Sequence, residues 1–445
     1  MPALRIDRDG IDPVREESFR LLDEIDPCGF ILFGGRAHDV ARLTAELNAR
    51  AGRPLLFGAD LERGAGQQFE GLTRIPTPMA IAACPEARSL ACLAGKLTAV
   101  EARSIGVNLL FAPVCDVNTE PKNPIMNVRS FSGDSRTVGE LAKQWIHGAQ
   151  AAGAIACAKH FPGHGNTTKD SHLELPEGPR DEAEFRSVHL QPFRDAIAAG
   201  VGSLMVAHMT VPAIDDSGLP ATLSRRVVTD LLRGELGFDG LVITDALVMK
   251  GIHTDEIEAA VLAAYAGCDI LLYPDSPRAV LQRLRESERD PVASMNRVER
   301  LLAHPLAAKI ARSCLTLLDG RPVAPECFLV IHDDDRLDPA PFREAARAAG
   351  WRELARDESP RDPSRCVTAV FAMPGAWRGR SGPSEENRMK IPAGSGVISF
   401  GDPYFLAQVT DASFRIAAYD DHPLTQRAAV AALQGGHGFA GRVPF

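Results

Sequence analysis

The stretch GLVITDAL (240–247) contains a short apolar run with an aspartate directly after it. Six further runs have a similar build, in which an apolar core ends in polar or glycine-rich residues: GFILFGG (29–35), PLLFGAD (54–60), GVNLLFAPVCDV (106–117), AIACAKHF (154–161), GSLMVAHM (202–209) and DILLYP (269–274). Continuous apolar runs of this length are typical of strands that are buried on both faces of a parallel sheet. The chain is therefore expected to contain such a sheet.

Helix-like stretches lie between these runs. Two examples are EARSLACLAGKLTAVEARSI (86–105) and VGELAKQWIHGAQAAG (138–153), in which apolar residues recur at three- and four-residue spacing. At least seven strand and helix units within roughly 320 residues favour an α/β fold of the closed (β/α)8 TIM-like barrel type. An open, doubly wound sheet is the structural alternative.

A second alternation begins after the segment RPVAPE (321–326), which has the composition of a linker. Four apolar runs follow it: CFLVIHDDD (327–335), CVTAVFAMP (366–374), GVISFGDPY (396–404) and SFRIAAYDD (413–421). They predict a smaller α/β domain of about 120 residues. The expected division is a TIM-barrel catalytic domain over residues 1–320 and a C-terminal α/β domain over residues 327–445.

The bulk composition argues against several classes of partner. Of the 445 residues, 58 are acidic and 49 are basic, which gives a net charge of −9. Without a concentrated basic block, the chain is expected to bind neither nucleic acid nor a membrane, and a small, neutral or modestly polar substrate fits better. The N-terminus lacks the apolar core of a signal peptide, and no window reaches the ~20 apolar residues of a membrane span. Nine scattered cysteines without a CxxC motif indicate reduced thiols, so a cytoplasmic protein is expected.

Ionisable residues stand directly after five of the predicted strands. They are Asp60, Asp116, Lys159 with His160, His208 and Asp245. In a barrel these positions lie at the carboxyl ends of the strands, where active sites are built. Charged groups after apolar strands are costly unless they are paired or functional. A shared catalytic site is therefore expected at this end of the barrel.

The segment KHFPGHGNTTKDSH (159–172) carries the densest set of chemical groups. Asp170 and His172 are separated by one residue, so the carboxylate can fix the tautomer of the imidazole and stabilise its protonated form. A histidine held in this way titrates near neutrality and suits a general acid that protonates a leaving oxygen and later takes a proton from water. The alternative is a loop histidine with a purely structural hydrogen bond.

A metal site is a rival interpretation of the same segment. His160, His164 and His172 with Asp170 could ligate zinc. A catalytic metal in a barrel usually takes ligands from several strand ends, however, and no HxH follows the early strands. No glycine motif for a dinucleotide lies in register between a strand and a helix. The sequence therefore predicts neither a metal nor a cofactor.

Asp245 follows an apolar run and has two interpretations. A carboxylate at a strand end can attack an anomeric carbon and form a glycosyl ester, which water then cleaves. An aspartate after a strand is also a common helix N-cap. The motif alone does not separate a nucleophile from a cap.

Taken together, these motifs resemble glycoside hydrolase family three, in its β-N-acetylhexosaminidase (β-N-acetylglucosaminidase) branch. The matching pieces follow one another in the family's order: GFILFGG, GADLERG, NLLFAPVCDVN, NVRSFSGD, KHFPGHGNTTKDSH, SLMVAHM and GFDGLVITDALVM. The resemblance covers roughly residues 25–320, and KHFPGHG followed by DSH is highly specific. It implies a retaining hydrolase that releases terminal β-linked N-acetylglucosamine from a small carbohydrate, in peptidoglycan (muropeptide) recycling or in chitooligosaccharide trimming.

The resemblance also assigns roles to individual residues. Asp245 looks like the nucleophile that forms a covalent glycosyl-enzyme intermediate. His172 with Asp170 looks like the acid/base dyad that is peculiar to this branch. The residues that correspond to the sugar-gripping groups of the family are Asp60, Arg129, Lys159 and His160.

Two features depart from the family pattern. Members commonly carry a GGRVxR run just after the strand-end aspartate, whereas this chain has ERGAGQQF, so Gln68 stands where the last arginine is usual. Arg63 is the candidate substitute for that sugar contact. The C-terminal segment matches the family's second α/β domain only loosely, in SFGDPY and the closing GRVPF, and is expected to be shortened.

Two other functions remain open at this point. In a β-N-acetylglucosaminide phosphorylase, phosphate replaces water as the acceptor, and a neutral histidine repels phosphate less than a carboxylate does. In an inactive sugar-binding relative, the same residues bind sugar without turnover.

Overall fold

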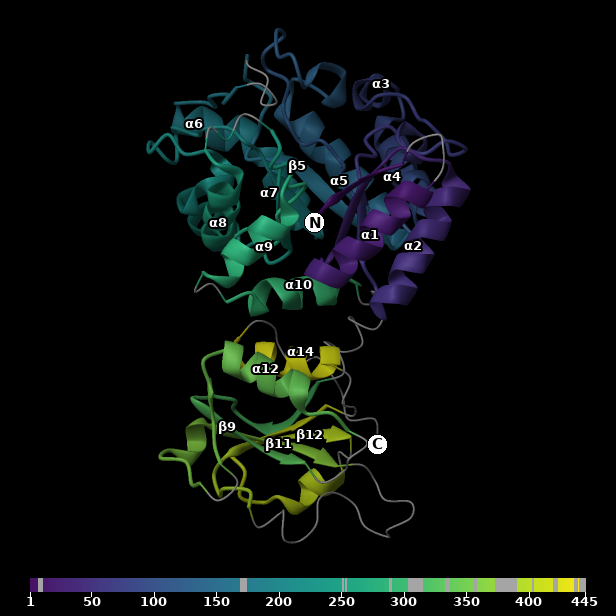
Figure 1. Cartoon of the computed structure of the whole chain (residues 1–445). Helices are drawn as coiled ribbons and strands as arrows, with labels where there is room; N and C mark the ends of the chain where they lie inside the picture. Colours follow the sequence, from purple (N-terminus) through teal and green to yellow (C-terminus); the bar gives the residue numbers. More distant parts are fainter. Residues whose placement is uncertain are drawn as a thin grey trace. The chain divides into compact units, whose positions relative to one another are not determined.

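The structure, a computed structural model, describes residues 1–6, 11–168, 174–249, 252, 254–287, 290–302, 315–332, 337–355, 358–372, 390–401, 404–418, 423–435 and 439. The chain divides into two compact units, Met1–Leu302 and Ala303–Phe445 (Figure 1). Each unit has a sheet and a hydrophobic core of its own.

Within the described residues, the first unit contains a seven-stranded sheet whose strands are all parallel and follow the order of the sequence. Its strands are β1 (Ala3–Arg5), β2 (Gly29–Phe33), β3 (Leu56–Ala59), β4 (Leu109–Leu110), β5 (Ile155–Phe161), β6 (Ser203–Val206) and β7 (Leu241–Thr244). Strands β2 to β7 lie inside the predicted apolar runs. Strand β1 was not predicted, because it has only three residues and is followed by a charged segment.

The sheet closes on itself through the segment 270–273, which lies inside the seventh predicted run. On one side, Ile270 bridges Ile243 of β7, and the Leu247 amide donates to the Leu272 carbonyl at 2.9 Å. On the other side, the N-terminal amino group of Met1 donates to the Leu271 carbonyl at 2.9 Å. The Tyr273 amide in turn donates to the Met1 carbonyl at the same distance. The predicted TIM-like barrel is confirmed, with this segment in the eighth position.

Helices surround the strands (Figure 1). The α-helices are α1 (Asp12–Ile25), α2 (Ala37–Ala51), α3 (Pro78–Ala82), α4 (Ala87–Ser104), α5 (Ser135–Ala151), α6 (Glu182–Glu184), α7 (Gln191–Ala198), α8 (Glu256–Ala266), α9 (Pro277–Arg285) and α10 (Val292–Leu302). Shorter 3₁₀ turns are η1 (Ala65–Gln67), η2 (Asn127–Arg129) and η4 (Ala221–Leu223), and η3 (Phe185–His189) and η5 (Arg226–Glu235) are π-helical. Helices α4 and α5 confirm the helices predicted over 86–105 and 138–153.

Alternate residues of each barrel strand face two different cores. In β7, Leu241 and Ile243 belong to the apolar cluster inside the barrel, whereas Val242 packs outward among the helices. Met1 and Phe111 help to fill the barrel interior. Burial on both faces explains why the strands read as continuous apolar runs rather than as alternating ones.

Local sequence sets the start and the packing of α5. The Asp134 side chain caps this helix by accepting from the Thr137 amide at 2.8 Å, which is a favoured N-cap arrangement. Its neighbour α4 presents small residues, and a Cβ atom at Gly95 would lie 2.1 Å from the Trp145 carbonyl oxygen. The two helices can therefore approach closely only because position 95 has no side chain.

In its described part, the second unit holds a six-stranded sheet in the order β10-β9-β11-β12-β13-β8. The strands are β8 (Thr316–Gly320), β9 (Cys327–His332), β10 (Arg352–Glu353), β11 (Cys366–Ala372), β12 (Gly396–Gly401) and β13 (Phe414–Ala417). All neighbours are parallel except β8, which runs antiparallel to β13. Helices α12 (Ala340–Ala348) and α14 (Pro423–Leu433) lie side by side near this sheet (Figure 1), with turns η7 (Pro363–Arg365) and η8 (Tyr404–Gln408). The predicted second α/β domain is thus observed.

The division between the units differs from the predicted one. The barrel unit ends at Leu302, and residues 316–320, which were assigned to the barrel, form β8 of the second sheet. Strand β8 pairs with Phe414–Ala417, about a hundred residues further along the chain. The apolar pattern of the segment gives no sign of which sheet it joins, because its partner is distant in sequence. No helix in the described ranges is long and apolar enough to cross a membrane.

Candidate active site

Five strands of the barrel end in ionisable side chains at the same face. Asp60 follows β3 and Asp116 follows β4 by a few residues; Lys159 and His160 lie within β5, His208 follows β6, and Asp245 follows β7. Because parallel strands of a closed barrel end at one rim, these residues approach one another.

The most strongly paired group combines two cations with two carboxylates. Lys159 donates to Asp60 Oδ1 and to Glu62 Oε1, both at 2.7 Å. Arg129 donates from Nε to Glu62 Oε2 at 2.9 Å and from Nη2 to Glu62 Oε1 at 2.7 Å. Both oxygens of Glu62 are therefore occupied, whereas Asp60 Oδ2 has no hydrogen bond within the described residues. The Glu62 side chain is 5% exposed and that of Asp60 is 32% exposed, so Asp60 is the carboxylate that a ligand can reach.

This pairing favours the charged forms of Glu62, Lys159 and Arg129. Burial alone would raise the pKa of Glu62, but Lys159 and Arg129 hold that pKa well below its usual range. Burial alone would lower the pKa of Lys159, but Asp60 and Glu62 raise it above its ordinary value. The pKa of Arg129 is also raised, against burial, chiefly by its hydrogen bonds to Glu62. A neutral lysine at this site is thereby disfavoured, and Lys159 acts as a donor.

His160 is held in one tautomer by its two neighbours. Its Nδ1 lies 2.7 Å from Asp116 Oδ2, and its Nε2 lies 3.3 Å from Arg129 Nη2. A guanidinium group can only donate, so Nε2 accepts and the proton resides on Nδ1. The imidazole ring is thus fixed at both nitrogens.

Asp116 also fixes the backbone of the loop after β5. Besides the His160 ring, it accepts from the His160 amide at 3.1 Å and from the His164 amide at 2.6 Å. Burial alone would raise the pKa of Asp116, but these partners lower it, chiefly through His160. A Cβ atom at Gly165 would lie 1.8 Å from the Val117 carbonyl oxygen, so only glycine fits there. Asp116 is therefore a fully buried anchor rather than a group that a ligand can reach.

Asp245 stands apart from the paired group and is partly buried. Its Oδ1 accepts from the Ala246 amide at 2.8 Å, and its own amide donates to the Val206 carbonyl at 2.9 Å. Burial alone would raise the pKa of Asp245, but the neighbouring His160 and His208 lower it. An ionised carboxylate that keeps a free oxygen is the state that a nucleophile requires.

His208 supports the backbone that carries Asp245. Its Nε2 lies 3.1 Å from the Ala246 carbonyl oxygen and its Nδ1 lies 2.8 Å from Thr222 Oγ1. Because a carbonyl oxygen can only accept, Nε2 carries the proton. His208 is fully buried, so we assign it to holding the strand end in place.

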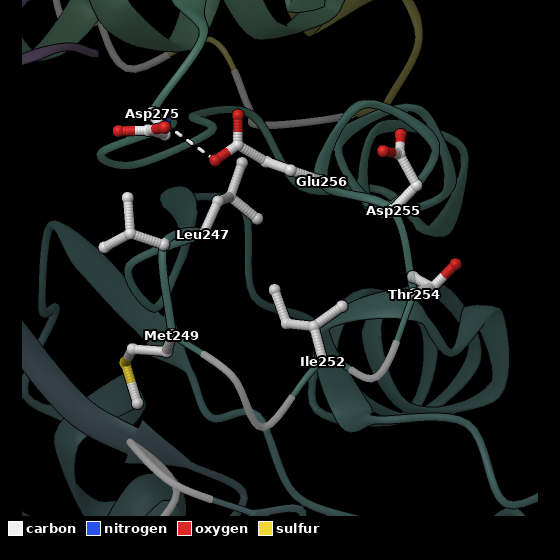
Figure 2. A pocket seen from close by; sticks show the side chains of 8 residues that line it. Leu247, Met249, Ile252, Thr254, Asp255, Glu256 and Asp275 are labelled. Atoms are coloured by element: carbon white, nitrogen blue, oxygen red, sulfur yellow. Dashed lines mark hydrogen bonds between the residues drawn. The ribbon is translucent and has the colours of Figure 1, made fainter.

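A cavity of about 670 Å³ lies next to the loop after β7, and the first of its lining residues, Leu247, is two positions after Asp245 (Figure 2). Leu247, Met249 and Ile252, from the loop after β7, form its apolar wall. Glu256, at the start of α8, accepts from the Asp275 amide at 2.7 Å. This hydrogen bond joins α8 to the segment that follows the eighth barrel position.

The structure brings some of the predicted residues together and leaves others outside. Asp60 contacts Lys159, and Arg129 contacts His160, while Asp245 interacts with the charge of Lys159. The predicted acid/base pair, Asp170 and His172, lies outside the described residues, so the predicted dyad stays a prediction. No group of three or more histidine, cysteine, aspartate or glutamate side chains among the described residues is arranged to hold a metal ion.

Sequence reasoning missed Glu62, whose signal was a second carboxylate two residues after the strand-end Asp60. The departure from the GGRVxR pattern, with Gln68 and its candidate substitute Arg63, occurs in the same loop. Gln68 accepts from the Gly34 amide at 3.4 Å. The buried Arg63 Nε has no hydrogen-bond partner among the described residues.

Residues 35–304 match the family described as "Glycosyl hydrolase family 3 N terminal domain". The chain belongs to glycoside hydrolase family 3. The matched segment covers more than half of the 445 residues and includes every strand end described above. The chain is accordingly an enzyme of the glycoside hydrolase class, as predicted.

Relatives of this family 3 chain match one or both of its units. A protein of Tolumonas auensis named "Beta-hexosaminidase" is 38% identical over 312 residues, which cover 68% of this chain and 91% of the relative. A Cellulomonas fimi protein named "Beta-N-acetylglucosaminidase/beta-glucosidase" is 28% identical and covers 94% of this chain and 88% of its own length. A family 3 β-N-acetylglucosaminidase structure from Paenibacillus is 28% identical with a TM-score of 0.63, over 99% of this chain and 96% of that one. Both units of this chain thus have counterparts in known proteins.

Proposed function

We propose that this family 3 enzyme is a retaining β-N-acetylhexosaminidase that hydrolyses terminal β-linked N-acetylglucosamine. The names of the relatives support the substrate class. The observation that carries the mechanism is Asp245, a carboxylate with a lowered pKa beside His160, Lys159 and the sugar-binding candidates. A carboxylate at this rim can attack the anomeric carbon of a sugar bound against Asp60 and Lys159.

In the first step, an Asp245 oxygen forms a bond to C1 of the sugar while the bond from C1 to the leaving oxygen breaks. His172, protonated and supported by Asp170, gives its proton to that leaving oxygen. In the second step, water attacks C1 and gives a proton to His172, and the ester bond to Asp245 breaks. The anomeric configuration is retained because C1 is inverted twice.

The paired group after β3 and β5 would bind and orient the sugar. Asp60 Oδ2 is free to accept from a hydroxyl, and Lys159 keeps one N–H beyond its two bonds to Asp60 and Glu62. Arg129 uses Nε and Nη2 for Glu62, which leaves Nη1 with only a 3.5 Å contact to a carbonyl oxygen. Hydroxyl groups that are gripped more tightly in the transition state than in the ground state lower the barrier.

Glu62 would act as a positioning residue. It contacts Lys159 and Arg129 through charge-assisted hydrogen bonds and has no free oxygen left for sugar. Removal of its charge would leave Lys159 paired with Asp60 and Arg129 without a directly paired carboxylate among the described residues. We expect both cations to move away from the positions that the sugar requires.

The test is hydrolysis of 4-nitrophenyl β-N-acetylglucosaminide beside the corresponding β-glucoside, in phosphate-free and phosphate buffers, with and without a chelator. The proposal predicts a preference for the N-acetyl sugar, free N-acetylglucosamine in both buffers, and no effect of the chelator. Sugar 1-phosphate that appears only with phosphate would instead establish a phosphorylase. Binding of N-acetylglucosamine without turnover of either substrate would establish an inactive sugar-binding relative.

The natural leaving group is tested by the same assay with other substrates. A muropeptide fragment and a chitooligosaccharide, compared by kcat/KM, distinguish peptidoglycan recycling from chitooligosaccharide trimming. Both carry the terminal N-acetylglucosamine that the proposed function requires.

A further inference from the structure

Two cysteines of the second unit lie side by side on neighbouring strands. Cys327 is the first residue of β9 and Cys366 is the first residue of β11, and the parallel register pairs the two positions directly. Both side chains belong to the same apolar face of the sheet. Both thiols are free, and both are buried, Cys327 to 9% exposure and Cys366 to 0%.

The backbone just before the two cysteines is fixed. The Glu326 amide donates to the Arg365 carbonyl at 2.9 Å, and the side chains of these two residues form an ion pair. On the other side of β9, the Arg352 amide donates to the Glu326 carbonyl at 3.0 Å. These bonds hold the starts of β9 and β11 next to each other, so the thiols are brought together by the surrounding sheet.

The spacing of such a pair suits a covalent bond. Neighbouring strands lie about 4.7–4.9 Å apart, and disulfides span Cα distances of about 4.4–6.8 Å. Burial raises the pKa of Cys366, and contact with the Cys327 thiol raises it further. The contact of the two thiols agrees with the register of the strands.

We propose that Cys327 and Cys366 are a disulfide-forming site that reacts with small disulfides of the glutathione class. The more exposed Cys327, as its thiolate, attacks one sulfur of the small disulfide, breaks the S–S bond and releases one small thiol. The Cys366 thiolate then attacks the Cys327 sulfur of the mixed disulfide and releases the second small thiol. Two protein thiols are oxidised, the small disulfide is reduced to two thiols, and the two protons of the cysteines end on the released thiols.

The new bond would close the chain from residue 327 to residue 366. A covalent link between β9 and β11 restricts the unfolded chain and stabilises the second unit. We expect the midpoint of its thermal unfolding to rise by roughly 5–10 °C. Because burial raises the pKa of Cys366, bond formation should also accelerate as the pH increases, since the thiolate is the reacting form.

The experiment treats the full chain with oxidised glutathione, blocks the remaining thiols, and analyses tryptic peptides by mass spectrometry without reduction. Trypsin cuts after Arg365, so Cys366 begins its own peptide. The expected product is a cross-linked pair of peptides that contain Cys327 and Cys366 and that separate on reduction. The Cys268→Ser variant, which removes another buried cysteine, should give the same product, and Cys366→Ser should not.

Recovery of Cys327 and Cys366 as blocked, unoxidised thiols would overturn the proposal. Cys327 found only as a mixed disulfide with glutathione would overturn it as well, because the second attack would then not occur. The wild-type measurement decides the question by itself if Cys366→Ser fails to fold.

Discussion

The two units are both built on largely parallel sheets of apolar strands, but they differ in what the interior contains. In the barrel, buried ionisable side chains gather at the strand ends and include Glu62, Asp116, Lys159, His160 and His208. The described residues of the second unit bury hydroxyl and amide side chains, namely Thr368, Ser395, Ser399, Thr425 and Gln426, without a buried charged side chain among them. Buried charge is costly to keep unless it is paired or functional, so the cluster at the strand ends favours this rim as the place of the proposed chemistry.

The difference between the charged barrel rim and the second unit is tested most sharply at Asp245. Asp245→Asn keeps the shape of the side chain but removes the charge of the proposed nucleophile. We expect kcat to fall by about 10⁴-fold or more, while binding of N-acetylglucosamine by calorimetry changes little. Turnover close to that of the wild type would remove Asp245 from the mechanism.

His172 should show a loss that depends on the leaving group. For His172→Ala we expect a loss of about 10²–10⁴-fold with poor leaving groups, the range for a general acid. The loss should be smaller with an activated aryl glycoside, because a good leaving group needs little protonation. The measurement is kcat/KM on a disaccharide and on the 4-nitrophenyl glycoside, and equal losses on both would contradict the acid assignment.

Glu62→Gln tests whether the buried Glu62 carboxylate supports catalysis by holding Lys159 and Arg129 in position. Lys159 and Arg129 lose a shared charged partner, so we expect kcat/KM to fall by roughly 10–100-fold, about 1.4 kcal/mol for each tenfold loss. Glu70→Gln, an exposed position in the same loop, is the matched control and should be close to wild type. Equal activity of the two variants would show that Glu62 does not position the cations.

Acid unfolding should also separate Glu62→Gln from the wild type. The pKa of Glu62 is lowered on folding, so its charge stabilises the fold above the ordinary glutamate pKa of about 4.3, and this contribution is lost as the pH falls toward the folded pKa. Glu62→Gln should therefore be less stable near neutrality and lose less stability on acidification than the wild type. Urea midpoints measured at several pH values below about 6 test this. Parallel curves for Glu62→Gln and the wild type would contradict it.

The smallest effect is expected in the second unit. Arg415 contacts both oxygens of Asp319 between β13 and β8, and this pair is partly exposed to solvent. Asp319→Asn should lower the free energy of unfolding by less than about 1 kcal/mol, because water screens exposed pairs. A loss of several kcal/mol in urea unfolding would show that the second unit also depends on charge.

Much of the fold could be predicted because the strands are buried on both faces. Runs such as GLVITDAL need no partner to be recognised, and the strand ends then place Asp60, Lys159 and Asp245 at one rim. Strand β8 was assigned to the wrong unit because its partner, β13, lies about a hundred residues away.

Partners that are distant in sequence also limited the prediction of the site. Arg129 and Lys159, the partners of Glu62, lie 67 and 97 positions further along the chain. Pairing at that separation is visible only in the folded chain, so no local pattern could reveal what Glu62 holds.

If Asp245 forms a covalent bond to the sugar, that bond can be trapped and located in the chain. His172→Ala, which should release the sugar slowly, is mixed with the activated aryl glycoside, quenched in acid and digested with trypsin. We expect the peptide 234–250, which contains Asp245, to gain the mass of one N-acetylhexosamine residue. Steady turnover with this peptide unmodified, or with the sugar on another residue, would contradict it.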